Sequence, residues 1–367
     1  MEGPVRVAQV MGYMNGGGVE SVVMNYYRHI DRDKIQFDFI VCEGSTLIPR
    51  QEIERLGGRV FVVPDYKKTA QYLKQLNLLF KREGWSIVHS HMNSLSVLPL
   101  HSAKKAGVPI RIAHSHTTSG KDGFVRNLAK NGLCCFSRLY PTHLAACSKC
   151  AADWLFGKGQ PYAIFPNGVD IEQFRVAAGR RAEYRERLGF SSGDFVLGHV
   201  GRFVKVKNHA FLLDVYAVLR SLVPNAKLLL IGDGPLRDEV QDKVELLNLT
   251  DGVIMLGQRG DVPNLIATMD AFCLPSLYEG MPVVGIECQA AGVPVLVSTG
   301  VTEELKMSSL VEFESLSETP DVWARRILEL ASRPVVDLPS MDKYDINQCA
   351  SMLCEYYLDL GLSRQFL

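Results

Sequence analysis

Two glutamates, Glu279 and Glu287, stand eight positions apart in the C-terminal third of the chain. The apolar run from Ala271 to Leu274 predicts a buried strand before them, and Gly292-Val293-Pro294 ends a helix after them. Glu279 therefore falls in a strand-to-helix loop and Glu287 inside the helix, with Pro282 in its first turn, where a missing N–H costs nothing. This edge of an open parallel sheet is where such folds bind ligands, and the helix N-terminus offers free N–H groups to an oxygen-rich ligand.

Two cations, Arg202 and Lys207, follow the apolar residues 195–200 and precede a helix expected over residues 210–222. They lie in a strand-to-helix loop that begins at Gly201, which is where a phosphate binds in such folds. Arginine clamps an oxyanion with a planar fork, and lysine supplies a point charge. Two solvated surface cations are the alternative interpretation.

Four histidines end two predicted strands, His89 and His91 on the first and His114 and His116 on the second. Polar residues at the carboxyl ends of parallel strands line the ligand crevice. Imidazoles suit zinc, but no carboxylate lies near either pair in the sequence, so zinc is the weaker of the two interpretations. A histidine whose hydrogen bonds are simply satisfied within the fold is the plainer interpretation.

A glycine-rich stretch from Gly12 to Glu20 follows the apolar strand predicted over residues 5–10 and precedes a helix-like run from Ser21 to Ile30. Gly16 and Gly17 allow backbone N–H groups to approach a phosphate or a sugar closely. The spacing differs from Gly-x-Gly-x-x-Gly, so it does not predict a dinucleotide fingerprint. An ordinary strand-to-helix loop is the alternative.

Together these motifs resemble the signatures of the family 4 retaining glycosyltransferases, which have the GT-B architecture. The family's Glu-Gly-x-Pro, helix, Glu and Ala-x-Gly-x-Pro frame appears here from Glu279 to Pro294. Its diphosphate motif is matched from Gly201 to Asn208, its Gly-x-Gly-Pro motif from Gly232 to Pro235, and its interdomain junction from Pro166 to Asp170. With the glycine-rich loop, the motifs follow the family's order over nearly the whole chain.

The resemblance implies a role for each motif residue. Glu279 would contact the donor sugar, Glu287 the nucleotide ribose, and Arg202 and Lys207 the diphosphate. A histidine at the end of the second strand would bind a donor-sugar hydroxyl, and His116 matches best, with His114 as the alternative one register away. The other residues that the resemblance places around the donor are Gly16, Gly17, Gly201, Gln258, Arg259, Gly280, Met281, Pro282 and Val283.

No metal or other cofactor is expected, apart from the nucleotide-sugar co-substrate. The cations and a helix N-terminus can stabilise the charge that develops on the leaving diphosphate. No Asp-x-Asp triplet, the usual acidic metal ligand of other glycosyltransferases, occurs in a suitable loop.

The expected fold is α/β, with two facing Rossmann-like, doubly wound domains. A chain of 367 residues is long enough for two cores, and strands alternate with helices along it. Residues 1–170 would form the acceptor domain and residues 171–343 the donor domain. The resemblance implies that a C-terminal helix, at about residues 344–367, crosses back to the first domain.

The charge is distributed unevenly although the net charge is zero. Residues 61–150 carry 13 basic and 3 acidic residues, and the run from Phe124 to Tyr140 mixes apolar side chains with Arg126, Lys130 and Arg138. A basic amphipathic helix can bind an anionic membrane surface. Taken by itself, this run favours the alternative, a helix packed on the core with solvated charges. No nucleic-acid motif accompanies the basic residues. Nine cysteines without a secretory signal predict reduced thiols in a cytoplasmic protein. The excess of basic residues predicts that this protein can bind the inner face of the membrane.

The sequence therefore predicts a retaining glycosyltransferase that moves a sugar from a nucleotide-sugar to a glycan or an isoprenoid-lipid-linked acceptor. Among nucleotide-sugars, a UDP-sugar is the preferred expectation. The segment from Ser298 to Glu304 departs from the commonest family pattern and resembles the capsule and exopolysaccharide branch. A nucleotide-sugar epimerase and a non-catalytic sugar-nucleotide or glycan-binding partner of another transferase are the alternatives. The presence of Arg202, Lys207 and Glu279 argues against a non-catalytic binding partner.

Overall fold

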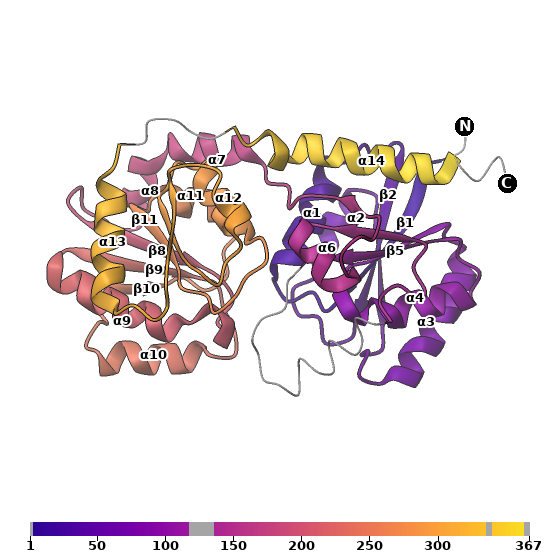
Figure 1. Cartoon of the computed structure of the whole chain (residues 1–367), viewed down its shortest axis with the longest axis horizontal. Coiled ribbons are helices and arrows are strands. Elements are labelled where there is room, and N and C mark those ends of the chain that lie inside the picture. The colour runs from indigo at the N-terminus through magenta and orange to yellow at the C-terminus, as the bar shows by residue number, and fades with distance from the viewer. Residues whose placement is uncertain (1–2, 117–135, 335–339, 363–367) are drawn as a thin grey trace. The chain divides into compact units, whose positions relative to one another are not determined.

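The computed structural model describes residues 3–116, 136–334 and 340–362, and the chain divides into two compact units. Unit 1 comprises Met1–Gly168 and Lys343–Leu367, and unit 2 comprises Val169–Asp342. The first boundary thus lies at Gly168, within the motif expected to join two domains, and the C-terminal helix belongs to unit 1. Each unit has its own parallel sheet with helices on both faces (Figure 1).

Unit 1 contains a parallel sheet in the order β3-β2-β1-β4-β5-β6-β7. The order of the first six strands is that of the doubly wound dinucleotide-binding fold, which turns back between the first and fourth strands. β2 is buried along its whole length, as expected of a strand covered on both faces. The strands are β1 (Val5–Gly12), β2 (Ile35–Cys42), β3 (Arg59–Val63), β4 (Ile87–Ser90), β5 (Ile110–Ser115), β6 (His143–Ala146) and β7 (Ala163–Ile164).

The helices of unit 1 cover both faces of this sheet. Two of them, α3 and α4, pack together beside α6, and their apolar faces close one core. On the other face the C-terminal helix packs against α1. The described helices are α1 (Gly18–His29), α2 (Arg50–Arg55), α3 (Thr69–Glu83), α4 (Val97–Lys105), α6 (Lys149–Phe156) and α14 (Ile346–Leu362), with a 3₁₀ turn at Asn93–Ser96.

Unit 2 repeats the same topology, with a parallel sheet in the order β10-β9-β8-β11-β12-β13. Its first strand, β8, lies between β9 and β11, so the order turns back at β8 as it does at β1 in unit 1. The strands are β8 (Phe195–Val200), β9 (Ala226–Ile231), β10 (Val253–Met255), β11 (Ala271–Leu274), β12 (Val295–Ser298) and β13 (Val311–Glu314).

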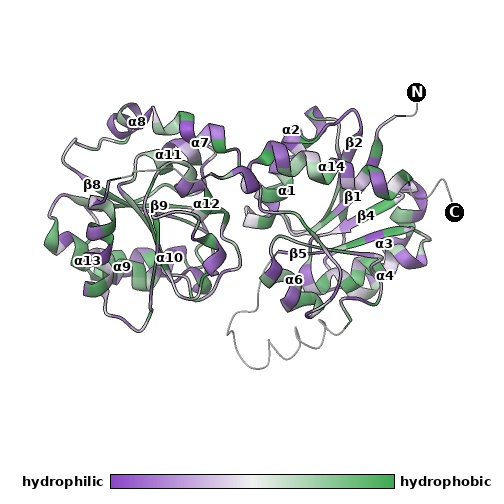
Figure 2. Cartoon of the chain, turned by 45° about the horizontal axis from the view of Figure 1, so that its top comes forward, coloured by the Kyte–Doolittle hydropathy of each residue, from purple (hydrophilic) through white to green (hydrophobic). Residues whose placement is uncertain are grey.

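The helices of unit 2 form two groups. One group packs α9 between α10 and α13, and the other brings α7 against α11 and α12. In both units the helices present apolar side chains to the sheet and polar ones outward, which gives the mixed helix colours of Figure 2. These helices are α7 (Ile171–Ala178), α8 (Arg181–Arg187), α9 (His209–Leu222), α10 (Arg237–Leu246), α11 (Val262–Ala267), α12 (Val283–Ala290) and α13 (Pro320–Ser332).

Three helices, α12, α4 and α6, begin in different ways. Pro282 is the residue that caps α12, one position before the first turn in which it was expected, and its extended φ and ψ begin the helix. The 3₁₀ turn at Asn93–Ser96 leads directly into α4, which begins at Val97. Ser148 caps α6 as a serine should, accepting a hydrogen bond from the Ala151 N–H.

The basic run from Phe124 to Tyr140 falls largely outside the described residues, which resume at Phe136. Arg126 and Lys130 lie outside them, whereas Arg138 is described and exposed. Among the described residues, no helix is both long and apolar enough to cross a bilayer.

Candidate active site

The two predicted motifs of unit 2 meet at the carboxyl ends of adjacent strands. β8 leads into the loop that carries Arg202 and Lys207, and β11 leads into the loop that carries Glu279. The strands pair directly, and the backbone N–H of Leu277 donates to the carbonyl of Val206 at 2.8 Å, which ties one loop to the other. This is the turning point of the strand order, where open α/β sheets bind their ligands.

The Arg202 loop rests on the loop that follows β9. The N–H of Gly201 donates to the carbonyl of Ile231, and the N–H of Phe203 donates to the carbonyl of Asp233 at 3.0 Å. A side chain at Gly232 would collide with the Gly201 carbonyl, and Gly232 also has a φ of +128°. The Gly-x-Gly-Pro motif is therefore needed to let the two loops approach each other.

Lys207 and Glu279 form an ion pair, with Nζ and Oε1 2.5 Å apart. The Ser276 hydroxyl donates to the same carboxylate oxygen at 3.0 Å. Both charged side chains are only partly exposed, 16% for Lys207 and 18% for Glu279, so the pair is shielded from water on most sides. The structure thus brings together two of the residues that the sequence assigned to the site.

The segment after β12 fixes the backbone of Glu279. The Glu279 N–H donates to the carbonyl of Gly300 at 3.0 Å, and the Ser298 hydroxyl donates to the carbonyl of Ser276. A side chain at Gly300 would collide with the Leu277 carbonyl. The stretch that departs from the common family pattern therefore supports the Glu279 loop directly.

Arg202 is exposed, and its side chain has no hydrogen-bond or ion-pair partner among the described residues. Its guanidinium thus keeps all of its donors available to a ligand. Gln258 is exposed as well, whereas Arg259 is paired with Asp261 through two hydrogen bonds of 2.8 Å. Arg259 would have to leave that pair before it could contact a base.

Glu287 lies in the middle of α12, and its carboxyl group has no hydrogen-bond or ion-pair partner in the part of the chain that the structure describes. Its side chain is partly exposed, but the carboxyl group is crowded by protein atoms, and this desolvation raises its pKa to about 7. At the start of the same helix, Gly280, Met281 and Pro282 are buried, whereas Val283 is partly exposed. A ligand that donates hydrogen bonds to Glu287 would stabilise its ionised form.

In unit 1 the glycine-rich loop already holds an anion. The backbone N–H groups of Gly16 and Gly17 donate to one carboxylate oxygen of Glu20, at 2.6 and 2.9 Å. Glu20 thereby caps the N-terminus of α1, as the third residue of a capping box does. A phosphate could use these N–H groups only after displacing Glu20.

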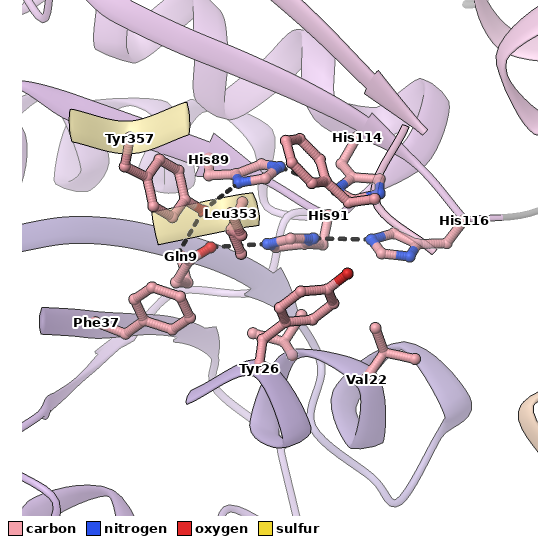
Figure 3. A pocket seen from close by; sticks show the side chains of 12 residues that line it. Gln9, Val22, Tyr26, Phe37, His89, His91, His114, His116, Leu353 and Tyr357 are labelled. Atoms are coloured by element: carbon pink, nitrogen blue, oxygen red, sulfur yellow. Dashed lines mark hydrogen bonds between the residues drawn. The ribbon is translucent and has the colours of Figure 1, made fainter. Parts of the chain in front are cut away.

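The four histidines form a buried cluster at the ends of β4 and β5 (Figure 3). His89 Nε2 lies 3.0 Å from His114 Nδ1, and His91 Nδ1 lies 2.8 Å from His116 Nε2. Gln9 Oε1 contacts His91 Nε2 at 2.8 Å. The cluster lines a small cavity together with residues of β1, α1, β2 and α14 and with the residue that follows β7: Gln9, Val22, Val23, Tyr26, Phe37, Leu353, Tyr357 and Phe165.

Three of these histidines, His89, His91 and His114, could share a metal ion, since they offer nitrogens within 4.8 Å of one another. Five of the six ring nitrogens of these three histidines are engaged in hydrogen bonds, and no carboxylate lines the cavity to balance a divalent charge. The residues therefore fit a hydrogen-bonded cluster better than a metal site.

Comparisons with known proteins agree with this geometry. The family model described as "Glycosyltransferase Family 4" matches residues 16–173, and "Glycosyl transferases group 1" matches residues 180–330. The putative glycosyltransferase EpsF of Bacillus subtilis is 38% identical over 338 residues, which cover 89% of this chain and 88% of EpsF. This chain belongs to glycosyltransferase family 4.

A second relative of this glycosyltransferase is the Escherichia coli UDP-Gal:α-D-GlcNAc-diphosphoundecaprenol α-1,3-galactosyltransferase. It is 28% identical over 314 residues, which cover 80% of this chain and 79% of the relative. Among solved structures, Anabaena HepE in complex with UDP and glucose matches with a TM-score of 0.78 at 16% identity, covering 96% of this chain and 98% of HepE. The fold is therefore GT-B, as expected.

The sequence analysis did not predict several residues that support the Glu279 loop and the histidine cluster of the transferase. Ser276 and Gly300 hold the Glu279 loop, and Gln9 and Tyr357 contact the histidines. Gln9 carried a usable signal, because an uncharged polar residue in an apolar strand needs a buried partner. The contact of Tyr357 with β4 spans 268 residues, and no local pattern predicts it.

The buried histidines of the transferase predict a loss of stability in acid. Burial lowers their pKa values below the usual 6.5, to about 3 for His116 and about 4 for His209, so they stay neutral while the unfolded chain gains protons. His116 and His209 should each lower the free energy of unfolding by about 2 kcal/mol at pH 5 relative to a pH above 7. The other buried histidines, all with lowered pKa values, are His89, His91, His114 and His199.

Glu287 opposes this trend, because its raised pKa makes the folded state the better proton acceptor between about pH 4.5 and 7. One carboxyl group against six histidines leaves a net loss in acid. Urea unfolding midpoints at pH 7.5, 6 and 5 should fall progressively, and the Glu287→Gln variant should fall more steeply. Midpoints that are flat or rise toward pH 5 would contradict the neutral cluster.

Proposed function

We propose that this transferase moves a sugar from a UDP-sugar to a glycan or isoprenoid-lipid-linked acceptor, with retention of the anomeric configuration, during synthesis of a cell-surface polysaccharide. The observation that carries the proposal is the ion pair of Lys207 and Glu279 at the turning point of the unit 2 sheet, in loops that also carry the unpartnered Arg202. The complexes of HepE with UDP and the UDP-Gal specificity in the name of the E. coli relative support UDP as the nucleotide.

The diphosphate would bind to the two cations of the β8 loop. Arg202 offers a free guanidinium, and Lys207 is held in place by Glu279 before any ligand binds. Because the charge on the leaving diphosphate grows as the bond to the sugar breaks, fixed cations stabilise the transition state more than the ground state. In this proposal the two side chains supply the positive charge, and no metal ion is needed.

Glu279 is better suited to holding the sugar than to attacking it. Its Oε1 accepts from Lys207 and Ser276, which lowers its nucleophilicity, and its second oxygen can accept from a sugar hydroxyl. A double displacement would need a free carboxylate at the anomeric carbon. Retention would instead follow from attack on the face of the leaving group, with the departing phosphate taking the acceptor's proton.

The reaction type can be tested on the whole protein. A screen of nucleotide-sugars for thermal stabilisation should select UDP-sugars, since a ligand raises the apparent stability of the state that binds it. The preferred donor is then incubated with a polyprenyl-diphosphate-linked N-acetylglucosamine, and NMR coupling constants assign the anomer of the product. An inverted product would overturn retention. Interconversion of UDP-glucose and UDP-galactose without acceptor would favour the epimerase instead.

Binding to an anionic membrane would bring the enzyme to a lipid-linked acceptor. Each basic residue near anionic lipid contributes about 1 kcal/mol, and salt screens the attraction. The protein should therefore cosediment with vesicles that contain phosphatidylglycerol, less with neutral vesicles, and less again at high salt. The basic excess that motivates this expectation lies in residues 61–150.

A charge-reversal variant, in which Glu replaces Arg126, Lys130 and Arg138, tests which residues bind the vesicles. It should lose cosedimentation and keep its affinity for UDP, because the nucleotide is assigned to unit 2. A wild-type protein that ignores anionic vesicles at low salt would contradict membrane binding and leave a soluble acceptor as the partner.

A further inference from the structure

The histidine cluster consists of two hydrogen-bonded chains that start at one residue, Gln9. In the first chain the Gln9 carbonyl Oε1 contacts His91 Nε2 at 2.8 Å, and His91 Nδ1 contacts His116 Nε2 at 2.8 Å. Gln9 and its partners are all buried. Figure 3 shows Gln9 and the two rings in a row, with His116 at the far end.

The second chain runs through the C-terminal helix. Gln9 Nε2 donates to the Tyr357 hydroxyl at 3.1 Å, and this hydroxyl lies 2.6 Å from His89 Nδ1. His89 Nε2 then contacts His114 Nδ1 at 3.0 Å. The chains therefore end on adjacent rings, since His114 and His116 stack with centroids 4.0 Å apart and planes 14° from parallel.

Each neutral imidazole has one donor and one acceptor nitrogen, so each ring passes on the direction of the hydrogen bond that it receives. The Gln9 carbonyl requires a proton on His91 Nε2, which leaves His91 Nδ1 to accept from His116 Nε2. His116 Nδ1 is then an acceptor, and it is buried with no partner among the described residues.

The second chain has the opposite direction. Tyr357 accepts from the Gln9 amide, and His89 Nδ1 is the other hydrogen-bond partner of its hydroxyl among the described residues, so the hydroxyl proton goes to His89 Nδ1. His89 then donates from Nε2 to His114 Nδ1, and the His114 Nε2–H is left as a donor. This nitrogen is also buried and has no partner in the described part of the chain.

The two chain ends are complementary for a reason that does not depend on how the amide is turned. Rotating Gln9 by 180° would reverse both chains together, so one end would still donate and the other accept. All four rings would then change from the Nε2–H to the Nδ1–H tautomer. Burial keeps the rings neutral, as this transmission of direction requires.

We infer that Gln9 and Tyr357 are positioning residues that hold all four histidines in the Nε2–H tautomer, so that His114 donates to and His116 accepts from sugar hydroxyl groups of a substrate. A hydroxyl group is the ligand that both accepts and donates, whereas a phosphate only accepts and a metal ion needs lone pairs alone. The identity of the ligand as a sugar rests on the proposed function. The hydroxyl groups belong either to the donor sugar or to the acceptor sugar.

The tautomers can be measured in the full chain without any turnover. In a protein labelled with ¹⁵N-histidine, long-range ¹H–¹⁵N correlation spectra at pH 7.5 should assign the Nε2–H form to all four residues. Tyr357→Phe removes the proton donor to His89, so His89 and His114 should show mixed tautomers while His91 and His116 stay unchanged. Tyr356→Phe, the neighbouring tyrosine of α14, is the matched control and should leave all four signals in place.

Three ligand arms identify the source of the hydroxyl groups. UDP alone should leave His114 and His116 unshifted. A shift with UDP-glucose or UDP-galactose would assign the donor sugar, and a shift with free N-acetylglucosamine at high concentration would assign the acceptor sugar. In turnover, Tyr357→Phe should lower kcat/KM about 5- to 10-fold, as the loss of one oriented hydrogen bond does, without changing the affinity for UDP.

The inference is overturned if the wild-type rings are charged or of mixed tautomer, if Tyr357→Phe leaves His89 and His114 unchanged, or if no sugar shifts the two terminal rings. Stoichiometric binding of Zn²⁺ at the four rings would also overturn it, since the ion would take the lone pairs. If the tautomers are as stated and free N-acetylglucosamine shifts the rings, but no nucleotide-sugar binds, the proposed function fails and this inference stands.

Discussion

Replacing Lys207 by Ala should lower kcat about 10²- to 10³-fold, the usual effect of removing one fixed group that stabilises transition-state charge. The lysine contacts Glu279 at 2.5 Å, so among the described residues the substitution leaves that carboxylate with the Ser276 hydroxyl as its one side-chain partner. Arg202→Ala removes the free guanidinium and should weaken UDP binding about 10- to 100-fold, the effect of losing a charge-assisted hydrogen bond. Calorimetry with UDP and steady-state kinetics measure both effects.

The matched control for these variants is Lys205→Ala. Lys205 lies in the same loop and carries the same charge, but it is exposed and has no ion-pair partner among the described residues. It should keep UDP affinity and turnover within about twofold of wild type, because a surface charge contributes little. Equal losses in the Lys205 and Lys207 variants would mean that the loop attracts the nucleotide by net charge alone. Unchanged UDP affinity in both the Arg202 and Lys207 variants would remove the diphosphate from this site.

Replacing Glu287 by Gln should weaken UDP binding about 10-fold, whereas Glu279→Gln should leave UDP binding nearly unchanged and reduce turnover of the UDP-sugar. The reason lies in their surroundings. Glu287 has no described partner and a pKa raised to about 7, so a ribose that donates two hydroxyl groups would hold it ionised. Glu279 is already paired with Lys207 and would meet only the sugar.

The same assignment predicts a pH dependence. Because the ribose needs the ionised form of Glu287, UDP binding should release protons near neutral pH and tighten as the pH rises from 6 to 8. UDP titrates in this range too, so the difference between wild type and Glu287→Gln isolates the protein's part. Glu303→Gln, an exposed glutamate of unit 2, serves as the control. The reverse pattern, with Glu279→Gln losing UDP, would mean that the two roles are exchanged.

The sequence predicted the parts of this site that depend on local pattern. Glu279, Lys207 and Arg202 follow strands whose apolar runs are unmistakable, and parallel strands bring their carboxyl ends to one edge. Two of these side chains are in direct contact. The two-unit organisation was also readable, since Pro166 to Asp170 marks the junction and Gly168 packs closely against Ile346 and Cys349 of α14.

What could not be predicted depends on contacts between distant segments. The Glu279 loop is fixed by Gly300 and Ser298, in the stretch that departs from the commonest family pattern. Gly16 and Gly17 were expected to offer free N–H groups, yet Glu20 occupies them, because an acidic residue three positions into a helix can reach back to its cap. The partner of the histidines on α14 is set by packing, which has no local signature.

The most direct test of the central claim, that the nucleotide binds at the turning point of the unit 2 sheet, is amide hydrogen exchange of the full chain with and without saturating UDP. Bound ligand slows exchange where it stabilises the backbone or contacts it. We predict slower exchange in residues 201–208, after β8, and in residues 279–287, at the start of α12. Unchanged exchange in both segments, while calorimetry shows UDP to be bound, would contradict the account.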